Sequence, residues 1–295
     1  MALRRRPLTS GDAWVVGPDG RRFWGTYGAA GLLLAHPHAG VLLQHRAEWS
    51  HFGGTWALPG GARHEGESAP DGALREAEEE AGVPVDRVRR RFLSRLDLGW
   101  WSYSTVAGIA DTLFDPVIGD AESIEVRWVP LDEINGLELH PSFAQRWPLL
   151  REDLFRDPVV IVDAANVVGS RPDGWWRDRA AAAARLAAGL ISLTESGWPA
   201  SALQLPHDLW WPRVVMVLEG QAKRMPALGS SHPLELVHAD SDGDSAIVDR
   251  VASEADPTQA IVVTADRGLG ERVRGLGASI ASPGAVLSAI DAVIE

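Results

Sequence analysis

The segment from Gly61 to Val83, GARHEGESAPDGALREAEEEAGV, constrains this chain more than any other part of its sequence. The stretch from Pro70 to Ala81 is rich in Ala, Leu, Arg and Glu, which are strong helix formers. Pro70 suits the first turn of a helix, and Gly82 suits the left-handed residue that ends one. The segment therefore predicts a helix over residues 70–81, entered and left by loops.

Three carboxylates share one face of this predicted helix. Glu76, Glu79 and Glu80 are spaced i, i+3, i+4, so their side chains project together, whereas Glu78 points to another face. Like charges at this spacing destabilise a bare helix, and a hard cation with oxygen ligands removes that penalty. The face therefore indicates a site for Mg2+ or Mn2+ that also binds substrate phosphates.

The same segment meets every fixed place of the pattern G-x5-E-x7-R-E-U-x-E-E-x-G-U, in which U is aliphatic. The matching residues are Gly61, Glu67, Arg75, Glu76, Ala77, Glu79, Glu80, Gly82 and Val83. This pattern is the Nudix box, and the segment closely resembles Nudix hydrolases. An ordinary acidic surface helix is the alternative, but it leaves the glycine and arginine places unexplained. The resemblance covers about residues 13–152 and implies an α/β/α sandwich with a mixed sheet.

Length and composition predict two domains and exclude several classes of protein. The chain has 295 residues, a net charge of −12 and no cysteine, and neither half is basic enough for a nonspecific nucleic-acid binder. No stretch approaches the roughly 18 apolar residues of a membrane span, and the basic N-terminus lacks the apolar run of a secretory signal. A cytoplasmic protein without membrane contact is therefore expected. The pattern changes near residues 154–158, which predicts a Nudix domain over 1–154 and a second domain over 155–295.

Apolar runs and turn signals predict that the first half is one α/β unit. A hairpin is expected over residues 14–24, strands over 31–35, 41–45, 92–98, 100–110 and 124–129, and a last helix over 140–150. The chain also holds 13 tryptophans, and those in the pairs at 100–101, 175–176 and 210–211 are expected mainly in cores, with base stacking as the alternative.

The resemblance implies roles for residues outside the glutamate helix. Arg46 ends an apolar strand upstream of the box, where the family often places a phosphate-binding arginine; a surface pair with Glu48 is the alternative. Arg75 is expected to orient the glutamates through charge-assisted hydrogen bonds. The residues expected on the substrate side are Arg46, Gly60, Gly61 and Arg75.

The catalytic base is left among several carboxylates. Glu76 and Glu80 on the helix could each take a proton from water, and so could the downstream Glu122. The family often supplies a further carboxylate before its closing strand, and Glu122 or Glu125 stands there. Either of these two could equally be a solvated strand residue.

The second half alternates apolar runs with helical segments. Strands are expected over 159–162, 214–218, 234–238, 261–264 and 278–281, and helices over 177–193, 244–255, 268–276 and 284–294. This alternation predicts a parallel, doubly wound sheet. Acidic residues follow four of the runs: Asp163, Glu219, Asp240 with Asp242 and Asp244, and Asp266. Because the carboxyl ends of strands form the ligand crevice of such sheets, these acids predict a Mg2+ or Mn2+ site, with solvated loop acids as the alternative.

Three familiar motifs do not fit this half. An EF-hand starting at Asp240 would have Ser245 and Val251 at two of its required places, and the phosphatase pattern D-x-D-G-T meets Asp244 instead of threonine. The glycines of a dinucleotide fold are also missing after the first strand.

Three short motifs resemble instead the NYN branch of PIN-like nucleases over about residues 158–290. They are Asp163-Ala-Ala-Asn166, the helix start Gly-Asp244-Ser, and Thr264-Ala-Asp266-Arg267. The resemblance implies that Asp163, Asp244 and Asp266 hold a metal and that Asn166 shapes the first loop, with Asp178 and Glu219 as further candidates. Ser245 stands where a second acid is usual, which puts nuclease activity in doubt.

These features predict a two-domain, metal-dependent enzyme. The first domain is expected to hydrolyse a nucleoside diphosphate linked to a group X, and LPGG leading into the box resembles mutator-type pyrophosphatases that act on nucleoside triphosphates such as oxidised dGTP. RNA 5′-end pyrophosphohydrolysis beside a nuclease is the main rival, with RNA as a partner. A nucleotide sensor whose second domain is a non-catalytic interaction module is the alternative from another class.

Overall fold

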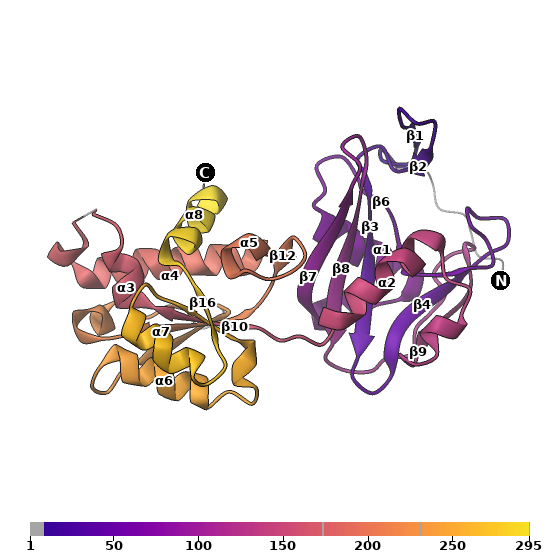
Figure 1. Ribbon diagram of the computed structural model, residues 1–295. Coiled ribbons are helices and arrows are strands. Elements are labelled where there is room, and N and C mark those ends of the chain that lie inside the picture. The colour runs from indigo at the N-terminus through magenta and orange to yellow at the C-terminus, as the bar shows by residue number, and fades with distance from the viewer. Residues whose placement is uncertain (1–8, 173, 230–231, 295) are drawn as a thin grey trace. The chain divides into compact units, whose positions relative to one another are not determined.

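The computed structural model describes residues 9–172, 174–229 and 232–294 (Figure 1). The chain divides into two compact units, Met1–Phe155 and Arg156–Glu295. No helix within the described ranges is both long and apolar enough to cross a membrane.

The first unit is built on a mixed sheet. Its strands are β3 (Ala29–His36), β4 (Gly40–Arg46), β5 (Trp56–Ala57), β6 (Gly60–Ala62), β7 (Val88–Asp97), β8 (Ser102–Ala110) and β9 (Ser123–Val129), and β1 (Trp14–Val16) and β2 (Arg22–Trp24) form a separate hairpin. Strand β3 is parallel to β8 and antiparallel to β4 and β6, while β7 pairs antiparallel with β8, and β9 with β4. The helices are α1 (Ala69–Ala81) and α2 (Pro141–Asp153), with short 3-10 turns η1 (Val85–Arg87) and η2 (Ile134–Gly136).

Helix α1 begins and ends as its sequence predicts. Ser68 caps it by accepting a hydrogen bond from the Asp71 N–H at 3.2 Å, and Gly82 ends it in the left-handed region with φ of 65°. Alanines on its inner side are fully buried, and α1 contacts β3 and β6. The glutamates of the box are therefore held over the Gly60–Gly61 strand.

The second unit is a parallel sheet in the order β14-β13-β10-β15-β16. Its strands are β10 (Val159–Asp163), β13 (Arg213–Leu218), β14 (Leu234–His238), β15 (Ala260–Val263) and β16 (Ser279–Ala281), and a small pair is formed by β11 (Trp198–Pro199) and β12 (Leu209–Trp210). Its helices are α3 (Ala164–Gly169), α4 (Arg179–Ser196), α5 (Ala200–Leu203), α6 (Gly243–Ala252), α7 (Arg267–Arg274) and α8 (Pro283–Ile294), with turns η3 (Trp175–Arg177), η4 (Gly220–Arg224) and η5 (Pro257–Gln259). The first strand in sequence is central, so the winding direction reverses between β10 and β15.

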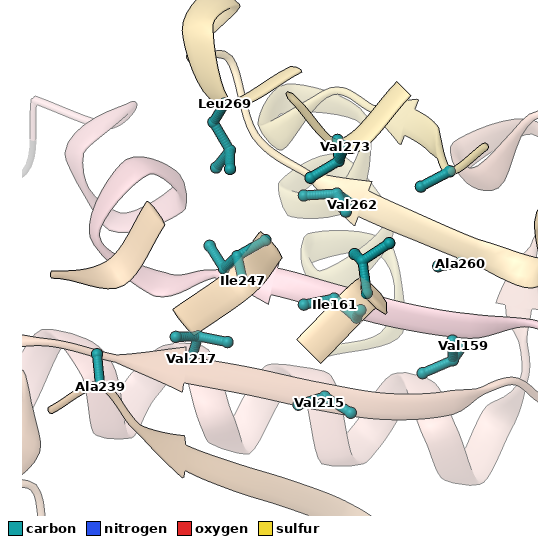
Figure 2. Close-up of a cluster of buried hydrophobic side chains, with 12 residues drawn as sticks. Val159, Ile161, Val215, Val217, Ala239, Ile247, Ala260, Val262, Leu269 and Val273 are labelled. Carbon is teal, nitrogen blue, oxygen red and sulfur yellow. The ribbon is translucent and has the colours of Figure 1, made fainter. Parts of the chain in front are cut away.

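Alternate residues of the central strands form the core of this sheet's α6–α7 face. Figure 2 shows Val159 and Ile161 of β10 beside neighbouring strand residues and below side chains of the two helices. The cluster consists of Val159, Ile161, Val215, Val217, Ala239, Ile247, Val251, Ala260, Val262, Leu269, Val273 and Ala278. Helices α3, α4 and α8 lie on the opposite side of the sheet (Figure 1). The second unit is therefore a doubly wound α/β layer structure.

The expected fold class is confirmed in both halves, with local differences. Strand β8 begins at Ser102 and not at Trp100, because Gly99 adopts a φ of 81° and its N–H donates to Asp97 Oδ1 at 2.7 Å, which closes a turn there. The sequence also gave no indication of α3, α5, β11 and β12, which are too short to show a period. Of the tryptophan pairs, Trp101 is buried as expected, whereas Trp176 is 56% exposed.

Two glycines of the second unit offer a test of its helix packing. A Cβ on Gly189 of α4 would lie 2.5 Å from Ile290 Cγ2 of α8, whereas a Cβ on Gly284 would meet nothing within 4 Å. We expect Gly189→Ala to lower the unfolding free energy by about 1–3 kcal/mol, since overpacking outweighs the gain in helix propensity. Gly284→Ala is the matched control and should not destabilise. Equal melting temperatures for the two variants would contradict this packing.

Candidate active site

Arg75 forms hydrogen bonds with three glutamates of the first unit, Glu67, Glu76 and Glu79. Its Nε donates to Glu67 Oε1 at 2.7 Å, and its Nη2 donates to Glu67 Oε2 at 2.9 Å and to the Ala62 carbonyl at 3.1 Å. Its Nη1 donates to Glu76 Oε1 at 2.7 Å and reaches Glu79 Oε2 at 3.4 Å. The hydrogen bonds to Glu67 raise the pKa of Arg75 further above its ordinary value. The guanidinium thus directs its donors at protein oxygens, which fits the orienting role that the sequence predicts.

The two glycines of β6 contact the carboxylates of Glu76 and Glu80 on α1. The Gly60 N–H donates to Glu80 Oε2 at 2.8 Å. A Cβ on Gly61 would lie 2.9 Å from Glu76 Oε1, so a larger residue would displace that carboxylate. Glu76 and Glu80 are buried to 6% and 4% exposure, while the side chain of Glu79 is 41% exposed. Gly60 and Gly61, expected on the substrate side, therefore also shape the seat of the glutamates.

A cleft of about 1110 Å³ opens beside these glutamates. Its lining includes every residue that the sequence places at the first site: Arg46, Gly60, Gly61, Arg75, Glu76, Glu79, Glu80 and Glu122. Arg46 Nε donates to the His51 carbonyl at 3.1 Å, which directs the side chain along the cleft wall. Glu125 is outside the lining and pairs with Arg127 at 3.2 Å. Among the described residues, no group of three or more His, Cys, Asp or Glu stands arranged around a single metal position.

Asp120 is a carboxylate of this cleft that the sequence analysis missed. It is 4% exposed, lines the cleft and accepts a hydrogen bond from the Glu122 N–H at 2.8 Å. The preceding residue is tied to the glutamate helix, because the Gly119 N–H donates to the Glu80 carbonyl at 2.9 Å. The Gly-Asp step just before the closing strand is the sequence signal that could have found it.

Much of the remaining cleft lining is aromatic. Its rings come from three separate segments and include Trp14, Trp24, Trp49, His51, Phe52, His140 and Phe143. Partial burial, followed by the nearby charges of Arg46 and His51, lowers the pKa of His140 to about 4. The cleft lining thus combines carboxylates with aromatic and imidazole rings.

The second unit brings its predicted acids together where the winding direction reverses. Thr264 Oγ1, which follows β15, donates to Asp163 Oδ2 at the end of β10 at 3.0 Å, and the Ala265 N–H donates to Asn166 Oδ1 at 2.8 Å. Burial and the nearby charges of Asp244 and Glu219 raise the pKa of Asp163. Burial and then Asp266 raise the pKa of Asp244.

Several of these acids also begin helices. Asp163, Asp242 and Asp266 each accept a backbone N–H as the cap of α3, α6 and α7. Asp178 does the same for α4, so helix capping explains an aspartate at this position without any role as a metal ligand. Asp244 is not a cap, and Arg272 lies 3.8 Å from it. Folding therefore explains part of the acidic pattern. Of the other members, Glu219 accepts a hydrogen bond from the Gly243 N–H at 2.8 Å, and capping does not explain Asp240 and Asp244.

The pKa of His140 leads to a test of pH dependence. Between about pH 6.5 and 4, His140 is protonated in the unfolded chain but stays neutral in the folded chain. The unfolding free energy should therefore fall as the pH drops through this range. We expect His140→Phe to remove part of that fall in chemical denaturation. An imidazole titration followed by NMR should give a midpoint near 4, and a midpoint near 6.5 would contradict this environment.

Comparison with known proteins identifies the first unit. The family model described as NUDIX domain matches residues 26–152. The chain is 48% identical over 151 residues to "Putative 8-oxo-dGTP diphosphatase 3" of Mycobacterium tuberculosis, covering 48% of this chain and 69% of that protein. It is 42% identical over 146 residues to "Nucleoside triphosphate pyrophosphatase/Nudix hydrolase fusion protein" of Bifidobacterium longum, covering 47% of this chain and 30% of the relative. The solved Nudix hydrolase RenU of M. smegmatis shares 46% identity over 48% of this chain and 94% of its own, with a TM-score of 0.44. The chain therefore belongs to the Nudix family and is a hydrolase of phosphorus-containing anhydrides.

Proposed function

We propose that the first unit is a pyrophosphohydrolase of nucleoside triphosphates, with an oxidised guanine nucleotide such as 8-oxo-dGTP as the leading substrate. The observation that carries the proposal is a single cleft that joins the box glutamates to an aromatic wall. Carboxylates suit the diphosphate end of such a substrate, and flat rings suit its base. The printed name of the M. tuberculosis relative supports the choice of nucleotide.

A divalent cation, Mg2+ or Mn2+, fits the oxygen ligands that Glu76, Glu79 and Glu80 offer. The donor set consists of carboxylates alone, which hard cations prefer, and Gly61 leaves the space that Glu76 needs. When bound, such a cation supplies charge neutralisation at the diphosphate and a more acidic water. Nudix hydrolases generally use metals of this kind.

The protein's own residues would divide the remaining work. Arg75 keeps Glu76 and Glu79 oriented, and the Gly60 N–H fixes one oxygen of Glu80. Glu76, Glu80 or Glu122 would accept the proton of the attacking water, and Asp120 joins them as a buried carboxylate of the same cleft. Arg46 would contact a substrate phosphate from the cleft wall.

Glutamine substitutions on α1 test these assignments. Glu79→Gln and Glu80→Gln should each lower turnover by about two orders of magnitude or more, because each removes a cation ligand or a base. Glu78→Gln is the matched control, since Glu78 is exposed on another side of the same helix. Pyrophosphate release from a panel of nucleoside triphosphates and 5′-triphosphate RNAs in Mg2+ or Mn2+ measures the effect. Wild-type turnover in a variant would refute that glutamate's role, and preference for RNA would favour the 5′-end reaction.

We further propose that residues 155–295 form a NYN/PIN-like domain with a second cation site, and residues 1–154 the Nudix domain. The division of the chain into compact units after Phe155 supports this assignment. Asp163, Asp244 and Asp266 are electrostatically coupled neighbours where the sheet winding reverses, with Glu219 close by. Hard cations suit such a carboxylate group, and cleavage of RNA is the activity that the resemblance of the three short sequence motifs implies. A sensor with a non-catalytic second domain is the rival that retained binding without cleavage would favour.

Asp163→Asn separates the two roles of this residue. Asparagine can still cap α3 through its side-chain oxygen, while the loss of charge relieves repulsion from Asp244 and Glu219. We expect a higher melting temperature in chelator, loss of Mn2+ binding to the second domain by calorimetry, and unchanged nucleotide hydrolysis. Asp256→Asn, which alters the exposed cap of η5, is the control. Unaltered Mn2+ binding in Asp163→Asn would refute the second site.

A further inference from the structure

Five rings form an unbroken series along one wall of the Nudix cleft. Neighbouring ring centroids are 5.3 Å apart from Trp24 to Trp14, 5.2 Å from Trp14 to His51, 4.3 Å from His51 to Phe52, and 4.7 Å from Phe52 to His140. All five line the cleft, and we call them the ring series. They come from the β1–β2 hairpin, the turn between β4 and β5, and the residue before α2. Three separate segments therefore converge to place aromatic rings in the same cleft as the glutamates.

Phe52 occupies a position that folding alone does not favour. Its φ is 55°, in the left-handed region that phenylalanine rarely adopts, and its side chain is exposed to 46%. The turn holds this conformation through a hydrogen bond of 2.7 Å from Thr55 Oγ1 to the Phe52 carbonyl. Strained backbone that presents a half-exposed ring in a cleft is typical of a binding site. Trp14 is a second partly exposed ring, at 39%, and the Arg22 guanidinium lies over it at 4.9 Å from the ring centroid.

His140 adds a directed polar group at the end of the series. Its Nδ1 accepts a hydrogen bond from the Ser142 N–H at 3.3 Å as the cap of α2, so the proton of the neutral ring is on Nε2. The pKa of His140 is held near 4 by burial and by Arg46 and His51, so this state persists across the neutral range. The ring is thus a hydrogen-bond donor without a charge. Uncharged rings suit a nucleobase better than a phosphate, which favours cations.

We propose that the ring series is the nucleobase subsite of this enzyme, in which Phe52 and Trp14 stack on the base and His140 Nε2 donates to an acceptor on its edge. This assignment rests on the proposed hydrolysis of nucleoside triphosphates. A base with a carbonyl at that edge pairs with the donor, whereas an amino group there leaves the donor unpaired. The subsite therefore favours guanine-type bases over adenine.

Base-free substrate distinguishes this subsite from the reaction centre. Hydrolysis of dGTP, dATP and deoxyribose 5-triphosphate should be measured for the wild type, Phe52→Leu, Trp14→Leu and His140→Phe. Each of the first two variants should raise the KM for dGTP about tenfold while leaving the base-free substrate unchanged, since stacking is lost and the chemistry is not. His140→Phe keeps a ring and should reduce the preference for dGTP over dATP about tenfold. Phe155→Leu is the control, a phenylalanine of similar exposure (40%) outside the cleft lining.

The outcomes separate the subsite from the proposed function. Equal losses on dGTP and the base-free substrate, or no loss on either, would overturn the subsite. If the wild type hydrolyses neither these three substrates nor 8-oxo-dGTP, the proposed function fails, and quenching of tryptophan fluorescence by guanosine then decides the subsite. Quenching that weakens in Trp14→Leu and Phe52→Leu would support it, and quenching that is absent or unchanged would overturn it.

Discussion

Carboxylates gathered on one helix repel one another, and the guanidinium of Arg75 offsets that repulsion. Because its planar fork engages both oxygens of Glu67, the side chain is fixed before it reaches Glu76 and Glu79. A lysine could not replace this geometry, since a point charge cannot form the same parallel pair. The helix that carries Glu76 and Glu79 is thus stabilised by an ion network that also sets the direction of their side chains.

The two units stabilise their clustered carboxylates in different ways. In the first, an arginine and two glycine residues hold the carboxylates over a strand. In the second, Asp163 and Asp266 accept hydrogen bonds from backbone N–H groups of the helices that they begin. The partial positive charge at these helix N-termini stabilises the two carboxylates. Thr264 then links the strands across the reversal by donating to Asp163. Asp163 and Asp266 therefore contribute to the stability of the fold as helix caps.

The sequence predicted most of what depends on local chemistry. The glutamate helix, its Gly82 end and the parallel sheet followed from spacing, turn residues and apolar runs, because those signals lie within one segment. Asp120 was missed, because its place in the cleft depends on a loop that packs against a helix distant in sequence. The ring series was equally invisible, because Trp14, Phe52 and His140 are joined only by tertiary structure. Trp100 was placed in a strand because its aromatic character outweighed the turn that Gly99 forms.

Two main-chain hydrogen bonds fasten the loop before β9 to the glutamate helix. The Val117 N–H donates to the Ala81 carbonyl and the Gly119 N–H to the Glu80 carbonyl, and a Cβ on Gly119 would lie 1.7 Å from the Glu79 carbonyl oxygen. Backbone contacts of this kind do not depend on which side chains the loop carries. During evolution, residues 111–116 could lengthen, shorten or change composition while Asp120 kept its distance from the helix. Gly119 is expected to resist substitution, because any side chain there would collide with the backbone of the helix.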